Sequence, residues 1–348
     1  MKVLVTGGAG YIGSHAVKEL LKAGHEVVVL DNLANGHQEA VDKRARLIVG
    51  STSDPDILLK VLRDDKIEAV MHFAANIEVA ESVSDPHKYY TNNFSNALTL
   101  LEAMKTAGVN KLVFSSTAAV YGNPVKTPIE ENQSLSPINP YGRSKMMTEM
   151  AIEDYRNAHG LGFAILRYFN VAGADPEAHI GEDHKPESHL IPRILAGANN
   201  PEVEVKIFGT DYPTHDGTCV RDYVHVMDLA HAHVLALESI KAGEGDIYNL
   251  GSESGFSVRE VINACEKVTG KKLKIVEEAR RAGDPATLIA SSQKIKNQLH
   301  WKPKYPSIKT IVQHAWNWHQ SHPDGFRTRS INPEALSQKH DNAKALSF

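Results

Sequence analysis

The sequence has few cysteines, no long apolar run and no excess of positive charge. Its two cysteines, Cys219 and Cys265, are too few and too far apart for a disulfide framework, so we expect both to be free thiols in a reducing compartment. No apolar stretch approaches the roughly 18 residues needed to cross a bilayer. The N-terminal apolar run is also too short for the core of a signal peptide. These absences predict a cytoplasmic protein that does not engage a membrane.

The balance of charge excludes a second class of partners. Lys and Arg number 38 against 42 Asp and Glu, which gives a formal net charge of -4. A protein that binds nucleic acid through its phosphates needs a positive field, and this chain has none overall. We therefore expect no nucleic-acid partner, and any anionic ligand must be held by local groups.

The first half of the chain alternates short β-branched runs with longer helical patterns. Most of the runs are continuously apolar, as in strands covered on both faces. This alternation predicts an α/β fold, a Rossmann-type doubly wound parallel sheet. Strands are expected at residues 2–6, 26–31, 46–49, 69–73, 111–115 and 163–169, and helices at 12–23, 55–64, 89–107 and 141–159.

The pattern changes after residue 173, where a polar stretch rich in acidic residues and histidines begins. We expect a first domain at 1–174, a smaller C-terminal α/β domain at 175–330 whose chain can weave back to the first, and a loosely held polar tail at 331–348. The second domain is expected to contain helices at 228–240, 257–269 and 308–319 and a strand at 246–250.

A glycine-rich turn joins the first expected strand to the first expected helix. Gly7, Gly10 and Gly13 fall at G-x-x-G-x-x-G spacing. In dinucleotide-binding folds such glycines permit a tight turn, close approach of a pyrophosphate and close packing of helix and strand. The helix N-terminus then offers unpaired N–H groups to the phosphates.

An acidic residue ends the second expected strand. Asp31 follows Gly13 by 18 residues, where a carboxylate can accept hydrogen bonds from an adenosine ribose diol. The same charge repels a 2'-phosphate, and residues 32–36 offer no arginine to receive one. The combination predicts NAD as the cofactor, against the alternative of a plain glycine turn and a solvent-facing Asp.

A tyrosine and a lysine are expected on one face of the helix at 141–159. Tyr141 and Lys145 stand at i and i+4, so the phenol and the ammonium can lie side by side. An unperturbed tyrosine has a pKa near ~10, and a base at neutral pH needs a value about 3 lower, equivalent to ~4 kcal/mol. A unit charge at about 4 Å can supply that amount at an effective dielectric constant of roughly 20.

A hydroxyl is expected close to this pair. Thr117 follows the strand at 111–115, at the carboxyl edge where ligands of parallel sheets bind. The three side chains can form an acid–base group, or they can be a solvated Tyr–Lys pair and a strand-ending threonine.

These motifs resemble the extended short-chain dehydrogenase/reductases and, among them, the family of UDP-glucose 4-epimerases. The similarity covers about residues 1–325. The matching segments are the T-G-G-x-G-Y-I-G-S start, D-N-L at 31–33, H-F-A-A at 72–75, S-S-T at 115–117, R-Y-F-N at 167–170, G-E-D at 181–183, R-D-Y at 221–223 and R-R-A-G-D at 280–284.

The resemblance implies a mechanism. Tyr141, assisted by Thr117, would remove the proton of the sugar 4-hydroxyl while C4 passes hydride to NAD. The 4-keto sugar would turn over and regain hydride on its other face. Lys145 would hold the nicotinamide ribose and lower the pKa of Tyr141. The resemblance also implies a homodimer, built from the helices at 89–107 and 141–159.

The resemblance further implies two sets of binding residues. The NAD set is Gly7, Gly10, Tyr11, Ile12, Gly13, Asp31, Asn32, Asn35, Gly36, Ser51, Thr52, Phe73, Ala74, Ala75, Asn92, Ser115, Tyr141, Lys145 and Phe169, in a domain at 1–174. The UDP-sugar set is Thr117, Tyr141, Asn170, His189, Leu190, Phe208, Arg221, Arg281, Asp284 and Leu288, mostly in the domain at 175–330.

The sequence departs from the family pattern at four positions. His189 replaces a common Asn at the UDP contact, Ser51 a common Asp beside the adenine, and Ile77 a lysine that some members place near the cofactor. Leu288 stands where a tyrosine narrows the sugar pocket in some members. We hypothesise that the enzyme also accepts UDP-GlcNAc and UDP-GalNAc.

Three other functions compete with this interpretation. A 4,6-dehydratase would need an Asp–Glu pair where this chain has Ala118 and Ala119. A UDP-glucuronate 4-epimerase or another nucleotide-sugar enzyme of the same family stays open, as does a non-catalytic NAD-binding regulator. The histidines near Glu182 match no standard ligand spacing, so we expect no metal and a polar loop instead.

Overall fold

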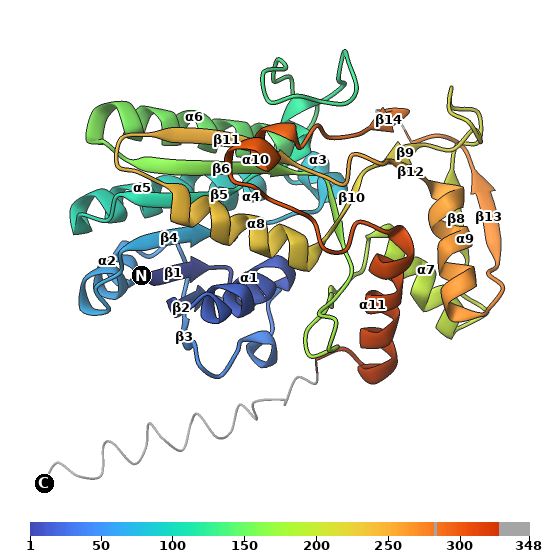
Figure 1. The fold of residues 1–348 in the computed structure, drawn as a ribbon, viewed down its shortest axis with the longest axis horizontal. Helices are drawn as coiled ribbons and strands as arrows, with labels where there is room; N and C mark the ends of the chain where they lie inside the picture. Colours follow the sequence, from blue (N-terminus) through green and yellow to red (C-terminus); the bar gives the residue numbers. More distant parts are fainter. Residues whose placement is uncertain (282–283, 327–348) are drawn as a thin grey trace, which may run out of the picture.

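A seven-stranded parallel sheet forms the larger part of the molecule (Figure 1). The computed structural model describes residues 1–281 and 284–326, so the expected tail at 331–348 lies outside the described residues. The strand order is β11-β6-β5-β4-β1-β2-β3. The strands are β1 (Lys2–Thr6), β2 (Glu26–Asp31), β3 (Arg46–Val49), β4 (Ala69–His72), β5 (Lys111–Ser115), β6 (Gly162–Tyr168) and β11 (Gly245–Leu250).

Helices cover both faces of this sheet because alternate strand residues point to opposite sides. Val3 and Val5 belong to the core shared with α1 and α8, whereas Leu4 belongs to the core beneath α2, α5 and α6. The helices are α1 (Tyr11–Lys22), α2 (Pro55–Asp64), α5 (Asn96–Ala107), α6 (Pro140–His159) and α8 (Val226–Ser239). The predicted Rossmann-type fold is therefore confirmed.

Most predicted elements of the sheet agree with the structure, but the helix expected at 89–107 does not. It is divided into α4 (Pro86–Tyr89), the π-helix η2 (Tyr90–Ser95) and α5. A π-helix adds a residue per turn without changing the apolar character of the segment, so hydrophobic periodicity alone does not reveal it. The short elements α3 (Val79–Ser84), η1 (Gln38–Ala40) and η3 (Ala118–Tyr121) were also not predicted.

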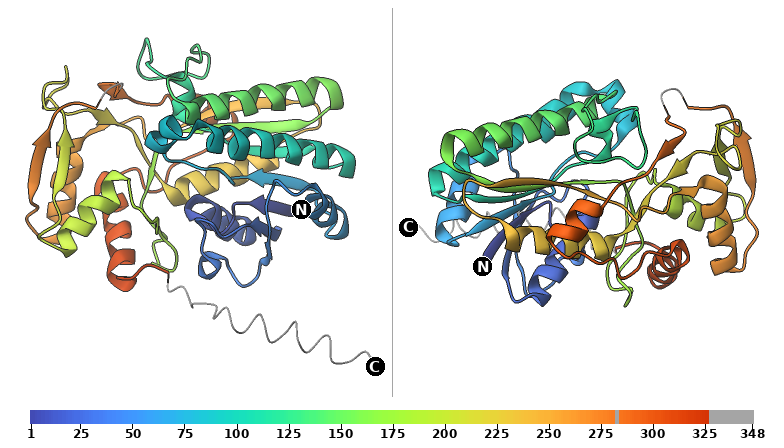
Figure 2. Two further views of the ribbon diagram at one scale, coloured as in Figure 1. Left: turned by 180° about the vertical axis from the view of Figure 1, so that it is seen from behind. Right: turned by 45° about the horizontal axis from the view of Figure 1, so that its top comes forward.

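A smaller lobe packs beside the carboxyl edge of the sheet (Figure 2). Its core lies among α7 (Leu190–Asn199), α9 (Val258–Thr269) and α11 (Ile308–Ser321). The helix α7 was not predicted, nor were the short strands. These strands are β7 (Asn170–Ala172), β8 (Val205–Phe208), β9 (Val220–Arg221), β10 (Tyr223–His225), β12 (Phe256–Ser257), β13 (Ile275–Glu278) and β14 (Thr287–Leu288), and the remaining helix is α10 (Gln293–Gln298).

The chain returns from the smaller lobe to the large sheet. The helix α8 packs against α1, and β11 pairs in parallel with β6 at the edge of the sheet. Residues 226–250 therefore complete the Rossmann layer although they follow α7 and β8 in sequence.

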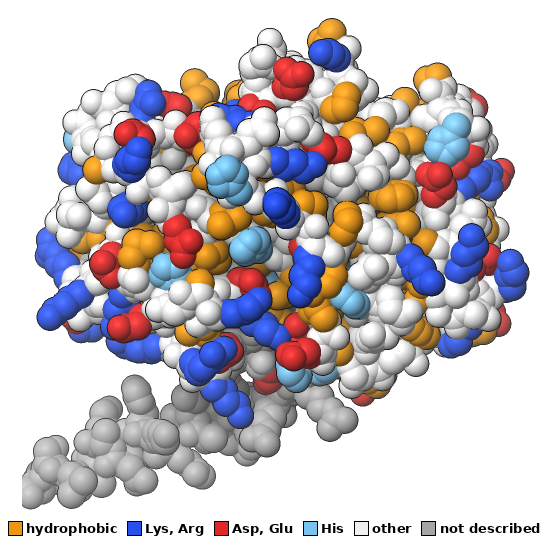
Figure 3. Space-filling view, in the orientation of Figure 1, with side chains coloured by type: hydrophobic (Ala, Val, Ile, Leu, Met, Phe, Trp, Pro, Cys, Tyr) orange, Lys and Arg blue, Asp and Glu red, His pale blue; other side chains and the backbone are white. Residues whose placement is uncertain are grey.

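Several composition-based expectations can be compared with the structure. Cys219 and Cys265 are both buried free thiols, as predicted. Within the described residues, no helix combines the length and the apolar character needed to span a bilayer. Figure 3 shows basic and acidic side chains interspersed over the face in view, without a continuous patch of one sign.

Candidate active site

The residues predicted to bind the cofactor lie where parallel strands of the sheet end. Gly7 follows β1, Asp31 ends β2, Ser51 and Thr52 follow β3, and Phe73 follows β4. Ser115 ends β5 and Phe169 follows β6. Since β1 lies between β2 and β4, the chain crosses from one half of the sheet to the other at this edge, which is where ligands bind in such folds.

The glycine turn is built for close contacts. Gly7 has a φ of 73°, and a Cβ there would lie 2.6 Å from the backbone N of Ala74. A Cβ on Gly13 would lie 2.1 Å from the carbonyl O of Gly7. Gly10 differs, because its Cβ would meet only that same carbonyl O at 3.4 Å. The protein itself therefore requires glycine at 7 and 13, whereas the space beside Gly10 is open.

The first turn of α1 can bind an anion. Gly10 caps the helix without a side-chain hydrogen bond, and the first turn has no acidic residue. The N–H groups of such a turn, together with the helix dipole, attract phosphate oxygens. The open space beside Gly10 and these N–H groups fit the pyrophosphate of a dinucleotide.

Asp31 links the turn to the next loop. Its carboxylate accepts hydrogen bonds from the backbone N–H groups of Ala9 at 2.9 Å and Leu33 at 2.8 Å, and the residue is 8% exposed. A carboxylate has about four acceptor positions, so capacity for a ribose diol remains. On the neighbouring loop, the Ser51 hydroxyl lies 2.8 Å from that of Ser53.

The catalytic candidates meet beneath this edge of the sheet. Asn139 caps α6 by accepting a hydrogen bond from Gly142 N–H at 2.8 Å, which begins the helix that carries Tyr141 and Lys145. Lys145 donates to the backbone O of Ser115 at 2.8 Å. Thr117 caps η3 and accepts from Ala119 N–H at 3.1 Å. All three candidates are buried: Tyr141 and Thr117 are 8% exposed and Lys145 3%.

Burial shifts the proton affinities of these groups. Burial raises the pKa of Tyr141, and the hydrogen bond with Thr117 lowers it in part. Burial lowers the pKa of Lys145 to about 7, against the negative charge of Glu149. In the protein alone the pKa of Tyr141 lies above its usual value, because the loss of solvent outweighs the hydrogen bond with Thr117. That Lys145 lowers the pKa of Tyr141 stays a prediction for the filled site.

A buried polar network supports this group and was missed from the sequence. Arg167 forms an ion pair with Glu149 at 2.6 Å, and Glu149 also accepts a hydrogen bond from the Ser116 hydroxyl. Arg167 donates to the Tyr121 hydroxyl at 3.0 Å. Glu149 stands at i+4 from Lys145, so the helical spacing that identified Tyr141 and Lys145 could also have identified it.

The residues predicted to bind the nucleotide sugar come from several short strands. Arg221 pairs with Leu288 in the β9–β14 register and forms an ion pair with Asp284. The Arg281 guanidinium stacks over the Phe208 ring at 3.7 Å. Residues 208, 221, 281, 284 and 288, which are distant in sequence, thus lie in one region of the small lobe.

Three further predicted residues lie around this region: Asn170, which follows β6 closely, Leu288, and Leu190 in the small lobe. Asn170 pairs with Tyr223 in the β7–β10 register. Leu288 packs against the core that contains Phe169, next to the strand end that carries Thr117. Leu190 begins α7, with His189 as its N-terminal cap residue.

The histidine-rich loop brings together four side chains that their sequence spacing does not relate. Glu182, His184, Glu187 and His189 bring one ligand-type atom each to within 4.8 Å of one another, although their sequence spacing matches no standard set. The loop path, rather than helix or hairpin periodicity, brings them together.

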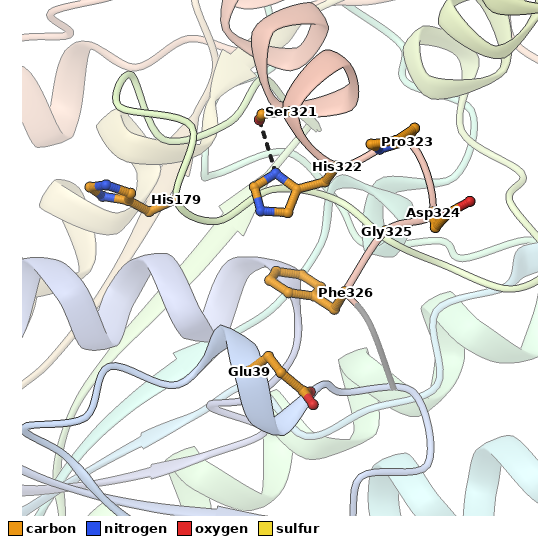
Figure 4. A pocket seen from close by; sticks show the side chains of 8 residues that line it. All are labelled: Glu39, His179, Ser321, His322, Pro323, Asp324, Gly325 and Phe326. Atoms are coloured by element: carbon orange, nitrogen blue, oxygen red, sulfur yellow. Dashed lines mark hydrogen bonds between the residues drawn. The ribbon is translucent and has the colours of Figure 1, made fainter. Parts of the chain in front are cut away.

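A hollow of about 360 Å³ lies away from the catalytic candidates, between η1 and the end of α11 (Figure 4). Glu39, His179, His322 and Phe326 are among the residues that line it. It contains none of the predicted site residues, so the strand-end site remains the candidate active site.

Comparison with known proteins defines the class of protein. The chain belongs to the NAD dependent epimerase/dehydratase family, whose model matches residues 3–251, and within it to the UDP-glucose 4-epimerases. The predicted NAD cofactor is confirmed by this membership.

Two relatives match nearly the whole chain. The UDP-glucose 4-epimerase of Lacticaseibacillus casei is 53% identical over 95% of this chain and 100% of its own length. That of Halalkalibacterium halodurans is 51% identical over 95% and 99%, respectively.

Solved structures agree with these relatives. UDP-glucose 4-epimerase from Bifidobacterium longum, in complex with NAD+ and UDP, is 38% identical, with a TM-score of 0.90 over 94% of this chain and 100% of that one. The UDP-Glc/GlcNAc 4-epimerase of Campylobacter jejuni is 42% identical, with a TM-score of 0.81 over 92% and 99%.

Proposed function

We propose that this protein interconverts UDP-glucose and UDP-galactose by oxidation and re-reduction at C4 of the hexose. The observation that carries the proposal is the burial of Tyr141, Lys145 and Thr117 at one strand edge, beside a glycine turn that fits a dinucleotide. The family membership and the names of the relatives support the same activity.

Each of the three buried side chains has its own role in the proposed reaction. A bound NAD would supply reversible hydride transfer at C4 of the sugar, and the glycine turn and Asp31 would hold it. Tyr141 takes the 4-hydroxyl proton and gives it back, and Thr117 orients that hydroxyl through the hydrogen bond that it shares with Tyr141. Lys145 places its ammonium against the Ser115 carbonyl, where it can bind the nicotinamide ribose.

Charge explains how Tyr141 can act near neutral pH. Burial raises its pKa in the protein alone, so a positive charge must come within a few ångströms when the site is filled. The Lys145 ammonium and the nicotinamide cation are the two groups that supply it. Proton removal by Tyr141 is then coupled to cofactor binding.

The UDP portion is assigned to the small lobe. Arg221 and Arg281 can hold the diphosphate with forked hydrogen bonds, and Phe208 presents an aromatic face to the uracil. Arg221 is paired with Asp284 in the structure, so binding would exchange that carboxylate for phosphate oxygens. Asp284 would then be free to accept hydrogen bonds from ribose.

A direct assay tests the activity. Purified protein is incubated with UDP-galactose, and UDP-glucose formation is followed with UDP-glucose dehydrogenase. We expect turnover without added NAD if the cofactor is retained during purification. The absence of turnover with and without added NAD would instead favour the non-catalytic NAD-binding regulator.

We also propose that the sugar pocket accepts UDP-GlcNAc and UDP-GalNAc. Leu288 is half-buried against the apolar cluster that contains Phe169, and it lacks the ring that would fill space beside the sugar. The Leu288→Tyr variant should lose turnover of the acetamido sugars by at least ~10-fold while plain hexoses stay within about 3-fold, since added side-chain volume discriminates by roughly 1–3 kcal/mol. Leu288→Met is the matched control. A native enzyme inactive on the acetamido pair would contradict the proposal.

A homodimer and a cytoplasmic location complete the proposal. Met150 on α6 is 59% exposed, and Val83 at the nearby α3 is 66% exposed, which favours burial of this face against a second copy. Light scattering of the purified protein should give twice the chain mass. The two free thiols fit a reducing compartment.

A further inference from the structure

Two carboxylates and two imidazoles converge on one point in the loop that precedes α7. The Nδ1 atom of His189 lies 2.9 Å from a Glu182 oxygen and 3.2 Å from a Glu187 oxygen. The Nδ1 atom of His184 lies 3.3 Å and 3.9 Å from oxygens of the same two residues. We refer to Glu182, His184, Glu187 and His189 as the loop cluster.

Among residues 1–281 and 284–326, the two imidazoles of the loop cluster are the ion-pair partners of the Glu182 carboxylate, and no donor outside the cluster hydrogen-bonds to it. Glu182 is 5% exposed, and Glu187 accepts a hydrogen bond from the backbone N–H of His189 at 2.7 Å. Both Nδ1 atoms are fully buried and have no hydrogen-bond partner of acceptable geometry. At 2.9 Å, the Glu182 oxygen must lie off the direction in which the His189 ring nitrogen points. A buried carboxylate without donors is costly unless a positive charge lies beside it.

We propose that the loop cluster binds one Zn²⁺ ion through Glu182, His184, Glu187 and His189. Tetrahedral zinc with bonds of about 2.0–2.1 Å to N and O places its ligand atoms roughly 3.3 Å apart. The four N–O separations range from 2.9 to 3.9 Å around that distance, with a different Glu187 oxygen nearest to each histidine. Imidazole and carboxylate ligands without thiolate suit zinc and other borderline divalent ions.

The charges of the loop cluster agree with a bound cation. The Glu182 and Glu187 carboxylates face the two imidazoles at distances from 2.9 to 3.9 Å. One divalent cation between them would neutralise both carboxylates.

A second cluster in the same segment provides a contrast. Asp175, Glu177 and His179 also lie within reach of a common ion. There, however, the ammonium of Lys18 lies 2.8 Å from Asp175 and 3.2 Å from Glu177. A protein cation already occupies the position between these carboxylates, so no metal is required.

The position of the site indicates a structural role. All four ligands come from the protein, which leaves no open coordination position for catalysis. The His184 ring lies 6.4 Å from that of Tyr11 in the glycine turn, and Gly181 packs against Trp318 of α11. His189 immediately precedes Leu190 at the start of α7. The ion would fix the loop that joins the cofactor edge to the small lobe.

Metal analysis of the full-length, untagged protein tests the inference. After expression with zinc in the medium, plasma mass spectrometry should find one zinc per chain. The His184→Ala variant should retain less than about a tenth of it, because loss of one of four ligands opens the site. His179→Ala is the matched control, since its acidic neighbours are neutralised by Lys18, and should retain the full amount.

A second measurement does not depend on the variants. Native protein is stripped with a chelator and titrated with Zn²⁺ or Co²⁺. We expect a higher melting temperature with zinc and the visible absorption of tetrahedral Co²⁺. Protein that neither copurifies with zinc nor responds to either ion would overturn the proposal, and would show that the loop cluster is held by two protonated histidines. Epimerase activity is assayed separately, so its loss or retention decides the proposed function alone.

Discussion

At the scale of single residues, the site depends on groups whose ordinary proton affinities are changed by burial. Tyr141 and Lys145 are shifted in opposite directions, because burial disfavours the charged form of each. In the protein alone, the phenol therefore stays protonated near neutral pH and the amine loses part of its positive charge. A positive charge beside Tyr141 would favour its phenolate form when the cofactor is bound.

Replacement of the Tyr141 hydroxyl tests its role. Tyr141→Phe should bind NAD normally but lower kcat by about two to four orders of magnitude, the scale expected for losing a general acid–base group. Tyr155→Phe, on the same helix with its hydroxyl 3.2 Å from Glu102, is the matched control and should keep its rate. Comparable kcat values for the two variants would remove Tyr141 from the mechanism.

Residue types and spacing identified the groups that bear the chemistry but not the groups that hold them. Asp31, Thr117, Tyr141 and Lys145 each stand next to a strand end or helix start, so local pattern places them. The pairing of Glu149 with Arg167 joins α6 to β6, and that contact depends on how the two elements pack. The loop cluster depends in the same way on the path of an irregular segment.

At the scale of elements, Gly10 and Gly13 belong to one glycine motif but are needed for different reasons, one for cofactor binding and one for packing. Gly13 is demanded by the contact between α1 and the end of β1, whereas Gly10 has room for a methyl group within the protein. The same substitution at the two positions should therefore have different consequences.

Two alanine variants should divide folding from cofactor binding. Gly13→Ala places a Cβ 2.1 Å from a backbone oxygen and should destabilise the fold by about 1–3 kcal/mol or more, as overpacking does. Gly10→Ala should keep the melting temperature of the NAD-free protein but weaken NAD binding. Thermal unfolding and NAD titration measure the two effects. Equal losses of stability would refute the distinction.

Element prediction succeeded where the pattern is local. The bounds of β1, β2, β3, β5 and α2 agree with the expected ranges, because long apolar runs and Asp54 capping α2 fix them in the sequence. The short strands of the small lobe have two to four residues, and β8–β13 or β9–β14 form only when distant segments meet. Such segments carry too little periodicity to be recognised alone.

At the scale of the whole molecule, buried neutral histidines make stability depend on pH. Burial lowers the pKa to about 4 in His15, about 3 in His72, about 2 in His225 and about 4 in His233. Their pKa in the unfolded chain is near ~6.5. The unfolded state therefore binds more protons between these values, and the free energy of unfolding falls as pH drops below about 6.5.

Urea unfolding at pH 7 and pH 5 measures this effect. Each of the four histidines should contribute a loss of roughly 2 kcal/mol. A variant that removes one group, His233→Gln, should reduce the loss by roughly a quarter. Equal stability at the two pH values would contradict the prediction.

The late position of β11 in the sequence has a consequence for synthesis on the ribosome. A nascent chain can form six strands once β6 has emerged, but the outer side of β6 stays bare until Gly245–Leu250 follow. A bare strand edge is a template for pairing with other chains. Premature termination after the sixth strand should therefore yield insoluble fragments, and chaperone protection is needed most while the roughly eighty residues between the end of β6 and the end of β11 are translated.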